Sequence, residues 1–363
     1  MKKKSIILTI SVLLTISFLA GCARTKHMEN KELSTEVSSD DSNVVKVTTE
    51  ETKLEDGFSA VRYEGDYGFD SFIKQGGASS DKEVIKFLGR NLLSGADMLS
   101  LKIDGFGCST LSVKSPEGNA LFGRNFDWKS CNALVVSSKP PNGYASVSTV
   151  NMDFISSGYG SLLNKLPDKV RTMAALYAPL DGMNEKGLCA AVLMIEDSNT
   201  INQNTEKPDI TTTTVIRLLL DKAANVDEAI SLLKQYDMHA SMGLMVHFAL
   251  ADKEGHSVVV EYVDNKMIVT ETPVVTNFYL AAGEKNGIGT EQSHTRYGIL
   301  TKELSNTKTM NMEEVRNAMD SVSKDNFNEF ESTEWSIVYD QNSGKVSYYH
   351  RENYKKEYTF HIE

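Results

Sequence analysis

One hairpin pattern constrains the fold of this chain more than any other feature. Cys108 to Lys114 alternates as a strand, residues 116–119 (PEGN) supply turn residues, and Ala120 to Asp127 returns as a second strand. In such a hairpin Cys108 lies beside the end of the returning strand. Arg124 and Asp127, which follow Cys108 by 16 and 19 positions, can therefore lie close to it in space. The pattern predicts a thiol, a guanidinium and a carboxylate in one place.

Other strand patterns recur along the chain and alternate with blocks of helical spacing. Strands are expected at residues 133–138, 145–151, 188–195, 245–252, 257–263, 266–271, 274–276, 336–340 and 345–350, and helices at 168–177, 212–222, 226–235, 292–304 and 312–321. Asn225 and Asn311, each followed three residues later by a glutamate, predict helix N-termini. Blocks of strands separated by blocks of helices are typical of a layered α+β domain.

The first residues have the features of a targeting segment. Lys2, Lys3 and Lys4 precede an apolar stretch that ends in small residues, so residues 1–21 are expected to be a signal peptide. The sequence LAGC, which ends at Cys22, is similar to the lipobox of bacterial lipoproteins. It predicts a lipid anchor on Cys22 that holds the protein at the extracytoplasmic face of a bacterial membrane. The alternative is an ordinary signal peptide followed by a coincidental cysteine.

Composition then divides the chain. Residues 22–56 are polar, charged and without aromatic residues, which predicts a flexible tether. Aromatic residues arrive from Tyr63 onward, so we expect residues 57–107 to be a prosegment or N-terminal subunit and 108–363 to be the catalytic domain. The net charge of −11 becomes −14 once the three lysines of the signal segment are subtracted. Nucleic acid is therefore not an expected partner.

The remaining cysteines and the histidines give no metal pattern. With Cys22 assigned to lipid, Cys108, Cys131 and Cys189 remain, an odd number. A disulfide between Cys131 and Cys189 is possible outside the cytoplasm, but Cys189 lies in an apolar run and favours a buried thiol. Neither a zinc-type spacing nor a cluster among the seven histidines is present in the sequence, so no metal and no cofactor are expected.

A catalytic reading of Cys108 requires a cut in the chain. In an N-terminal nucleophile hydrolase, the α-amine of the terminal residue serves as base for its own side chain. A free cysteine thiol and a free α-amine have pKa values of about 8.5 and about 7.7–8.0, so proton exchange between them is nearly balanced. Cys108 lies inside the chain, and the bond between Gly107 and Cys108 must therefore be cleaved. Taken alone, Cys108 fits a buried structural thiol better than a nucleophile.

Six ordered motifs carry a family resemblance. GCSTL, LFGRNFDW, DGMNEKGL, VVTNFYL, HTRYGIL and WSIVYD resemble, in this order, the choloylglycine hydrolase superfamily of linear-amide C–N hydrolases, over about residues 60–350. That superfamily includes bile-salt hydrolases, penicillin V acylases, an acyltransferase branch and acid ceramidase. The resemblance implies a four-layer αββα sandwich of two antiparallel sheets.

The resemblance also assigns roles. Cys108 matches the nucleophile, Arg124 the cation beside its sulfur, and Asp127 the carboxylate that orients the new α-amine. Asn184 and Asn277 match donors to the oxyanion, although each asparagine alone would also fit a turn.

Arg296 matches an arginine that holds the site together. The interval from Asn277 to Arg296 is shorter here than in bile-salt hydrolases. Asp181 and Glu185 are expected to be solvated. Cleavage before Cys108 resembles the acyltransferase and ceramidase branches, and the apolar residues before Gly107 favour a segment that stays docked afterwards.

The expected function is hydrolysis of a small non-peptide linear amide. Acyl transfer at the same site and a ligand-binding surface lipoprotein that is never processed are the alternatives. Conjugated bile acids, penicillin V and N-acyl amino acids or lactones all remain open as substrates, and the oligomeric state is not readable. Residues 138–144 and 153–163 are expected to surround the pocket. Aromatic side chains are candidates for an acyl pocket: Phe126, Trp128, Phe154, Tyr159 and Phe278.

Overall fold

The computed structural model describes residues 43–92, 107–159, 167–324 and 331–363. The signal segment and Cys22 lie outside the described residues. The strands are β1 (Thr52–Glu55), β2 (Phe58–Glu64), β3 (Gly107–Lys114), β4 (Ala120–Trp128), β5 (Ala133–Lys139), β6 (Ser146–Asn151), β7 (Asp181–Asn184), β8 (Cys189–Ile195), β9 (Asp209–Thr211), β10 (Asp237–His239), β11 (Met245–Ala251), β12 (Ser257–Val263), β13 (Lys266–Glu271), β14 (Val274–Val275), β15 (Ser332–Asp340), β16 (Lys345–His350) and β17 (Tyr358–His361). The helices are α1 (Phe69–Lys74), α2 (Asp81–Leu92), α3 (Met152–Tyr159), α4 (Asp168–Ala175), α5 (Thr214–Lys222), α6 (Val226–Leu233), α7 (Glu291–Asn306) and α8 (Met312–Asp320).

Two large sheets form the centre of the described structure. The larger has nine strands in the order β1-β2-β5-β6-β7-β8-β11-β12-β13, and the smaller has six in the order β14-β3-β4-β15-β16-β17. Neighbouring strands pair antiparallel except β2 and β5, which are parallel. Strands at the centre of each sheet, such as β4, β6 and β11, are buried along their whole length, because each sheet is covered on both faces.

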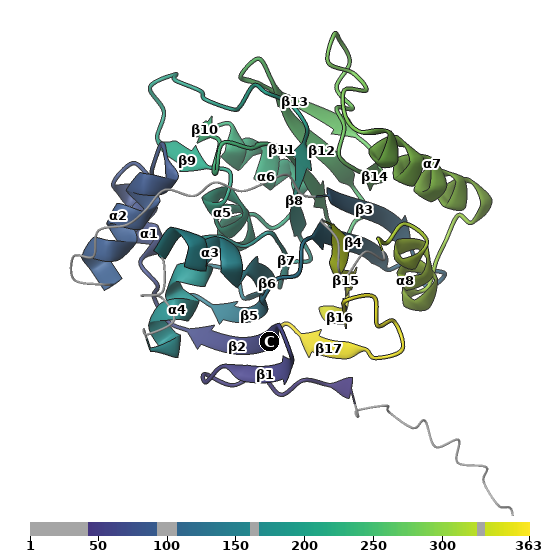
Figure 1. Ribbon diagram of the computed structural model, residues 1–363, viewed down its shortest axis with the longest axis horizontal. Helices are drawn as coiled ribbons and strands as arrows, with labels where there is room; N and C mark the ends of the chain where they lie inside the picture. Colours follow the sequence, from purple (N-terminus) through teal and green to yellow (C-terminus); the bar gives the residue numbers. More distant parts are fainter. Residues whose placement is uncertain (1–42, 93–106, 160–166, 325–330) are drawn as a thin grey trace, which may run out of the picture. The chain divides into compact units, whose positions relative to one another are not determined.

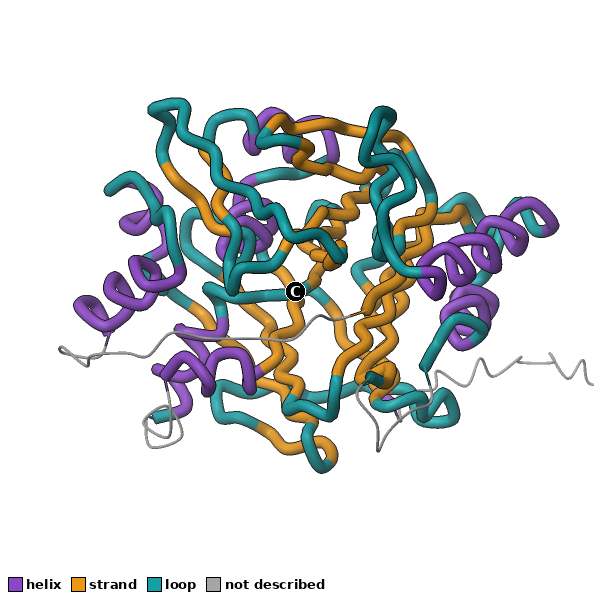
Figure 2. The backbone as a smooth tube through the Cα atoms, turned by 45° about the horizontal axis from the view of Figure 1, so that its top comes forward, coloured by secondary structure: helices purple, strands orange, loops and turns teal. Residues whose placement is uncertain are grey.

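Helices cover the outer face of each sheet. α7 and α8 pack on β3, β4, β14 and β15, whereas α4 and α5 pack on strands of the larger sheet. Figure 1 shows α7 and α8 on one side of the strands and α1 to α5 on the other. In Figure 2 the strands lie between two groups of helices. This is the αββα arrangement, which confirms the predicted α+β fold class.

A strand lies inside the segment predicted as a flexible tether. β1 forms a hairpin with β2, and Val45 donates its backbone N–H to Thr359 O at 2.8 Å. The boundary predicted at residue 56 is therefore wrong. Asp56-Gly57 forms the tight turn, with Gly57 at φ 77°, and such a dipeptide is a strong hairpin motif. The sequence did not predict β1, because it is a short edge strand with mostly polar residues.

Local capping explains why two helices begin where predicted. The Asn225 side chain accepts from Glu228 N at 2.9 Å, and Asn311 with Glu314 forms a reciprocal capping box at 2.9 and 2.7 Å. Eleven predicted strands occur within a residue or a few of their expected bounds. Strands of three or four residues such as β7, β9 and β10 are too short to show a period in the sequence.

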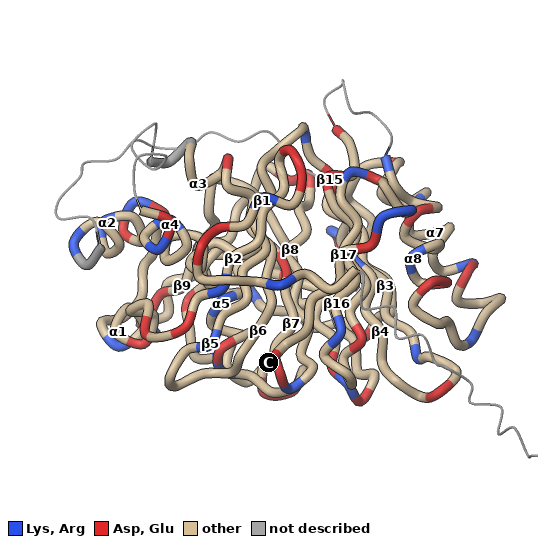
Figure 3. Tube along the Cα trace, turned by 90° about the horizontal axis from the view of Figure 1, so that it is seen from below, with Lys and Arg blue, Asp and Glu red and all other residues tan. Residues whose placement is uncertain are grey.

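The outer helices carry mixed charge. Acidic and basic positions lie intermingled on α1, α2, α4, α7 and α8 (Figure 3). Among the described residues, no helix combines the length and apolar character needed to cross a membrane.

Candidate active site

The β3–β4 hairpin places the predicted nucleophile beside the predicted cation. Thr110 pairs with Arg124 across the antiparallel ladder, so Cys108, two residues before Thr110, shares the face that Arg124 uses. Both side chains are fully buried against β8. Arg124 Nη2 donates to Val192 O at 2.9 Å, and Cys108 Sγ lies 3.8 Å from the same oxygen. The hairpin prediction is therefore confirmed, with its thiol and guanidinium facing the second sheet.

A buried carboxylate holds the other edge of the guanidinium. Arg124 Nε lies 3.3 Å from Asp181 Oδ2 on β7, and both side chains are 0 % exposed. Trp335 Nε1 donates to the same oxygen at 3.0 Å, and the Tyr339 hydroxyl donates to Oδ1 at 3.2 Å. The expectation that Asp181 is solvated is thus wrong, whereas Glu185 is exposed as expected. The sequence of β15 could have indicated a buried acceptor, because Trp335 and Tyr339, two aromatic donors four residues apart, share one face of the strand.

Burial controls the protonation of the thiol in the intact chain. Loss of hydration raises the pKa of Cys108 to about 11. The positive charge of Arg124 and a hydrogen bond from it act in the opposite direction and favour the thiolate. Desolvation opposes the charge of Arg124 too, but the neighbouring Cys108 and Asp181 raise its pKa. Arg124 therefore stays a cation and partly offsets the cost of ionising the thiol.

Asp127 lies at the bond that precedes Cys108. It pairs with Gly107 in the β3–β4 ladder, and its Oδ1 accepts from the Thr333 hydroxyl at 2.7 Å. Its Oδ2 is buried and has no hydrogen-bond partner among the described residues. Arg296 Nη1 and Lys324 Nζ lie 3.8 and 3.9 Å from that oxygen, beyond hydrogen-bond reach. An unpartnered buried carboxylate oxygen is costly, so its place beside Gly107 calls for an explanation.

Asn277 accepts a hydrogen bond from the backbone nitrogen of Cys108, the predicted nucleophile. Val275 of β14 pairs with Thr110, and continuing this register by two residues places Asn277 opposite Cys108. The backbone N–H of Cys108 donates to Asn277 Oδ1 at 2.7 Å. Asn277 Nδ2 donates one hydrogen to Met194 O at 2.7 Å. Because a primary amide carries two such hydrogens, the second can be directed to an oxyanion.

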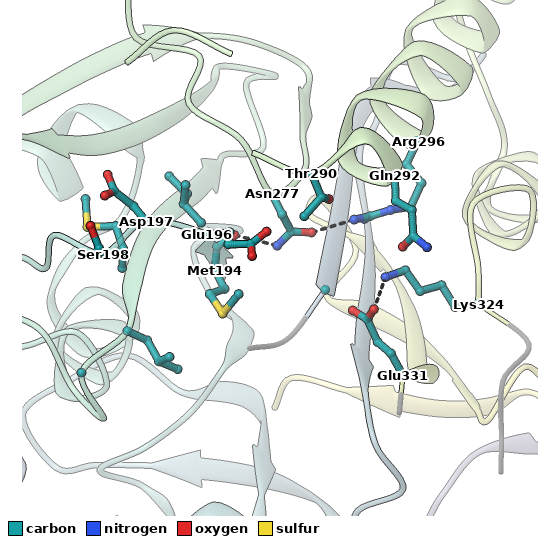
Figure 4. A pocket seen from close by; sticks show the side chains of 15 residues that line it. Met194, Glu196, Asp197, Ser198, Asn277, Thr290, Gln292, Arg296, Lys324 and Glu331 are labelled. Atoms are coloured by element: carbon teal, nitrogen blue, oxygen red, sulfur yellow. Dashed lines mark hydrogen bonds and ion pairs between the residues drawn. The ribbon is translucent and has the colours of Figure 1, made fainter. Parts of the chain in front are cut away.

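Arg296 joins these groups from the first turns of α7. Its Nη1 donates to Cys108 O and, at 2.6 Å, to the Ser109 hydroxyl, and its Nη2 donates to Asn277 Oδ1 at 2.8 Å. Figure 4 shows the Arg296 side chain reaching from the helix to Asn277. The structure thus brings Arg296 to the site, in the bridging position that the motif suggested.

Asn184 lies elsewhere and is fully engaged. Its Nδ2 donates both hydrogens, to Leu220 O at 3.0 Å and Ala223 O at 2.8 Å, at the end of α5. Its Oδ1 accepts from Lys186 N and Leu188 N, both at 3.1 Å, and so closes the turn between β7 and β8. No amide hydrogen remains for an oxyanion. The structure therefore places Asn184 as a structural residue and does not bring it to Cys108.

A buried histidine and glutamate support the segment that carries Asn277. His247 Nε2 lies 2.8 Å from Thr276 O, and His247 Nδ1 lies 3.1 Å from Glu261 Oε1. The same carboxylate accepts from Leu280 N and Ala281 N at 3.0 and 2.5 Å. The pair therefore fixes the chain on both sides of Asn277. The β11–β12 hairpin register places His247 opposite Glu261, but nothing local in the sequence brings this pair to the segment that carries Asn277.

A cavity of about 520 Å³ opens beside Gly107. This size suits a small organic ligand. The wall combines apolar side chains with charges of both signs, several of which are drawn in Figure 4. It is formed by Gly107, Met194, Ile195, Glu196, Asp197, Ser198, Gly243, Leu244, Met245, Asn277, Thr290, Gln292, Arg296, Lys324 and Glu331.

The predicted pocket loops and aromatic residues lie away from this wall. No residue of 138–144 or 153–159 contributes to it. Phe126 stacks on Trp335 at 4.0 Å, Trp128 meets Phe154 edge to face at 5.3 Å, and Phe278 stacks on His294 at 4.1 Å. These side chains pack in the protein interior or against α7, and the Tyr159 side chain lies outside the described part. Phe126, Trp128, Phe154 and Phe278 therefore do not line the cavity beside Gly107, and for Tyr159 the acyl pocket stays a prediction.

The three described cysteines are free and buried, so Cys131 and Cys189 do not form a disulfide. Burial raises the pKa of both thiols well above its usual range. Cys131 is nonetheless a useful comparison for Cys108, because it is an equally buried thiol without a guanidinium hydrogen-bonded to its sulfur.

Comparisons with known proteins agree with this fold. A family model described as acyl-coenzyme A:6-aminopenicillanic acid acyl-transferase matches residues 113–355. Penicillin V acylase from Pectobacterium atrosepticum is 31% identical over 125 residues, which is 31% of this chain and 32% of that protein. The alignment thus spans about a third of the relative.

Two solved structures share the architecture. Both are variants of conjugated bile acid hydrolase from Clostridium perfringens, with TM-scores of 0.54 and identities of 18% and 17%. Each superposition covers 70% of this chain and 92% of the other. At this identity they support the fold, while the family model covers most of the chain. The chain belongs to the acyl-coenzyme A:6-aminopenicillanic acid acyl-transferase family, within the choloylglycine hydrolase superfamily of N-terminal nucleophile hydrolases.

Proposed function

We propose that this protein hydrolyses non-peptide linear amides with Cys108 as nucleophile, after its own chain has been cut between Gly107 and Cys108. The observation that carries this proposal is the buried, unpartnered Oδ2 of Asp127 beside that bond. Cleavage turns the Cys108 nitrogen into an α-amine, which becomes an ammonium group when it takes the thiol proton. A carboxylate already in place would pair with that charge, which explains why an unsatisfied acceptor is maintained there.

The cleavage step uses groups of this chain alone. Cys108 Sγ attacks the Gly107 carbonyl carbon, the C–N bond breaks, and the thiol proton passes to the departing nitrogen. Water then hydrolyses the thioester, which gives a carboxylate on Gly107 and restores the thiol. Asn277 and Arg296 hold the N–H and the carbonyl of Cys108, so the attacking residue is fixed on both sides.

An amide substrate would follow the same route with one change. The freed α-amine of Cys108 takes the thiol proton and delivers it to the leaving amine. Arg124 favours the thiolate, and the second hydrogen of Asn277 Nδ2 can be donated to the oxyanion. One such donor lowers the barrier by about 3 kcal/mol. The cavity beside Gly107 receives the acyl group.

The segment before the cut supports a two-chain enzyme. β2 lies inside the larger sheet, between β1 and β5, and Phe58 stacks on Tyr348 at 4.6 Å. Asp81 of α2 accepts from Met242 N at 2.7 Å and so braces the loop that leads to the cavity. Releasing this segment would expose two sheet edges and several buried aromatic rings. It should therefore stay bound after cleavage.

Substitution of the nucleophile tests the proposal. Wild-type protein, Cys108→Ala and Cys131→Ala would be incubated with amides of bile acids, phenoxyacetic acid and fatty acids, and the released amine measured. We expect Cys108→Ala to remain one chain and to release no amine, whereas Cys131→Ala, which removes a buried thiol of the interior, is cut and active. Unchanged turnover in Cys108→Ala would overturn the proposal.

Acyl transfer is the second candidate, because the matching family model is described as an acyl-transferase. The two reactions share the thioester and differ only in whether water or an amine accepts the acyl group. Adding an amine acceptor during turnover separates them: a product that contains both acyl group and acceptor, in place of the free acid, would favour transfer.

We also propose a lipid anchor at Cys22, on the sequence LAGC. The anchor would hold the catalytic unit outside a bacterial cytoplasm, with residues 23–42 between them. One acyl chain gives only marginal membrane binding, and stable anchoring takes two or more. Cys22→Ala should move the protein from the membrane fraction to the soluble fraction of the producing cell; an unchanged membrane fraction would refute the anchor.

A further inference from the structure

The space next to Gly107 is closed on the side where an L-residue carries its side chain. A Cβ atom added there would lie 2.2 Å from Glu331 Oε1, 2.8 Å from Lys324 Nζ and 2.9 Å from Asp127 Oδ2. Real Cβ atoms essentially never approach heavy atoms closer than 3.0 Å. Gly107 itself lies on the cavity wall. All three atoms are ends of side chains, so a methyl group at this position requires the ends of Glu331, Lys324 and Asp127 to shift.

Glu331, Lys324 and Asp127 are linked by an ion pair and by hydrogen bonds through Thr333. Lys324 Nζ forms an ion pair with Glu331 Oε2 at 2.6 Å (Figure 4), and the two side chains are 12% and 21% exposed. The Lys324 backbone N–H donates to the Thr333 hydroxyl at 2.8 Å, and that hydroxyl donates to Asp127 Oδ1 at 2.7 Å. A methyl group at the closed position must therefore move an ion pair away from a buried carboxylate.

The same position matters for a substrate. During self-cleavage the Gly107 carbonyl carbon becomes bonded to Cys108 Sγ as a thioester. An amide substrate forms the same thioester with its own acyl group. The α-carbon of that acyl group then takes the place of Gly107 Cα and meets the same three neighbours.

We infer that Lys324 and Glu331, together with Asp127, form an acyl-side subsite that selects amides whose acyl α-carbon is an unbranched CH₂. A branch with the arrangement of an L-residue is excluded. The inference rests on the proposed function and adds to it a restriction on the acyl group, which must carry no L-type branch at its α-carbon. Lys324 and Glu331 act here as specificity-determining residues.

Self-cleavage tests the subsite without any substrate. Gly107→Ala places a methyl group at the closed position, so we expect its self-cleavage to be at least about tenfold slower than that of wild type. The fraction of cleaved chain is measured by mass spectrometry at intervals after refolding. Glu331 supplies the nearest atom, and Gly107→Ala/Glu331→Ala should recover most of the rate. The matched control is Gly107→Ala/Glu196→Ala, which removes another carboxylate of the cavity wall and should stay as slow as Gly107→Ala. Wild-type speed in Gly107→Ala, or equal recovery in both double variants, would overturn the inference.

Chiral substrates test it on the cleaved enzyme. The 4-nitroanilides of phenoxyacetic acid and of (S)- and (R)-2-phenoxypropionic acid would be compared, since the two enantiomers have the same intrinsic reactivity. The (S) form has the L arrangement, and we expect its kcat/KM to be at least about tenfold below that of the (R) form. Equal values would overturn the subsite. If no amide of any kind is hydrolysed, the proposed function fails, and the Gly107→Ala variants still decide the subsite.

Discussion

Replacing Arg124 separates its structural contribution from its chemical one. In Arg124→Met the side chain keeps most of its volume, but Asp181 loses the cation that lies 3.3 Å away and remains fully buried. Trp335 and Tyr339 still donate to the carboxylate. The charge itself is then uncompensated, and the variant should be strongly destabilised.

The magnitude follows from these contacts. Removing one partner of a buried ion pair costs about 3–5 kcal/mol. Adding Asp181→Asn removes the charge and leaves mainly two carbonyl oxygens, of Val192 and Asn125, without their guanidinium donors. That remainder is roughly 2 kcal/mol, so the double variant should regain about 2 kcal/mol of the loss.

Self-cleavage should not return with stability. At pH 7 a thiol with a pKa of about 11 is ionised in roughly one molecule in 10⁴, because the difference of four units is a factor of 10⁴. The Arg124 charge lowers the pKa of Cys108, so both Arg124→Met and the double variant should have still less thiolate. We therefore expect both variants to remain uncleaved for much longer than wild type.

Urea unfolding followed by circular dichroism measures the stability, and mass spectrometry measures the fraction cleaved after refolding. The matched control is Arg217→Met, which breaks another fully buried pair, with Asp221 at 2.9 Å on α5. It should lose comparable stability and still be cleaved wherever it folds. The reasoning is refuted if Arg124→Met unfolds within about 1 kcal/mol of wild type, or if the double variant cleaves at the wild-type rate.

Three further outcomes are expected. Asn277→Ala should lower the rates of self-cleavage and amide turnover by about 10²–10³-fold. Asn184→Ala should instead lower the urea midpoint and leave the turnover of the folded enzyme near wild type. Similar kinetic losses in both variants would contradict the assignment of Asn277 as oxyanion donor and Asn184 as structural residue. Because burial raises the pKa of Cys108 to about 11, the thiolate fraction rises with pH, so the self-cleavage rate of refolded chains should climb up to about pH 11 rather than level off near pH 8. The cleaved pieces should elute together in size-exclusion chromatography and separate only in denaturant, since β2 pairs with β5; separation without denaturant would contradict this.

Local patterns predicted the parts of the fold that local interactions determine. The β3–β4 hairpin followed from alternation and turn residues, and the two helix starts followed from Asn225 and Asn311 with their glutamates. The same hairpin geometry placed Arg124 and Asp127 near Cys108. The β1–β2 turn at Asp56-Gly57 was an equally local signal. It was missed because the polar residues of β1 favoured a flexible tether over a strand.

Contacts between distant segments were not readable. Asp181 meets Arg124, Trp335 and Tyr339 only after three strands of two different sheets have assembled, so its burial could not be inferred from neighbours in the chain. Lys324 reaches Gly107 in the same way. Asn184 shows the opposite error, because an asparagine in a turn was given a chemical role that its hydrogen bonds exclude.

The mass and first residue of the purified, active protein test the central claim most directly. Amino-terminal sequencing with intact-mass measurement should find a chain that begins at Cys108, together with a second piece that ends at Gly107. A preparation that hydrolyses amides while all of its protein remains uncut between Gly107 and Cys108 would contradict the account.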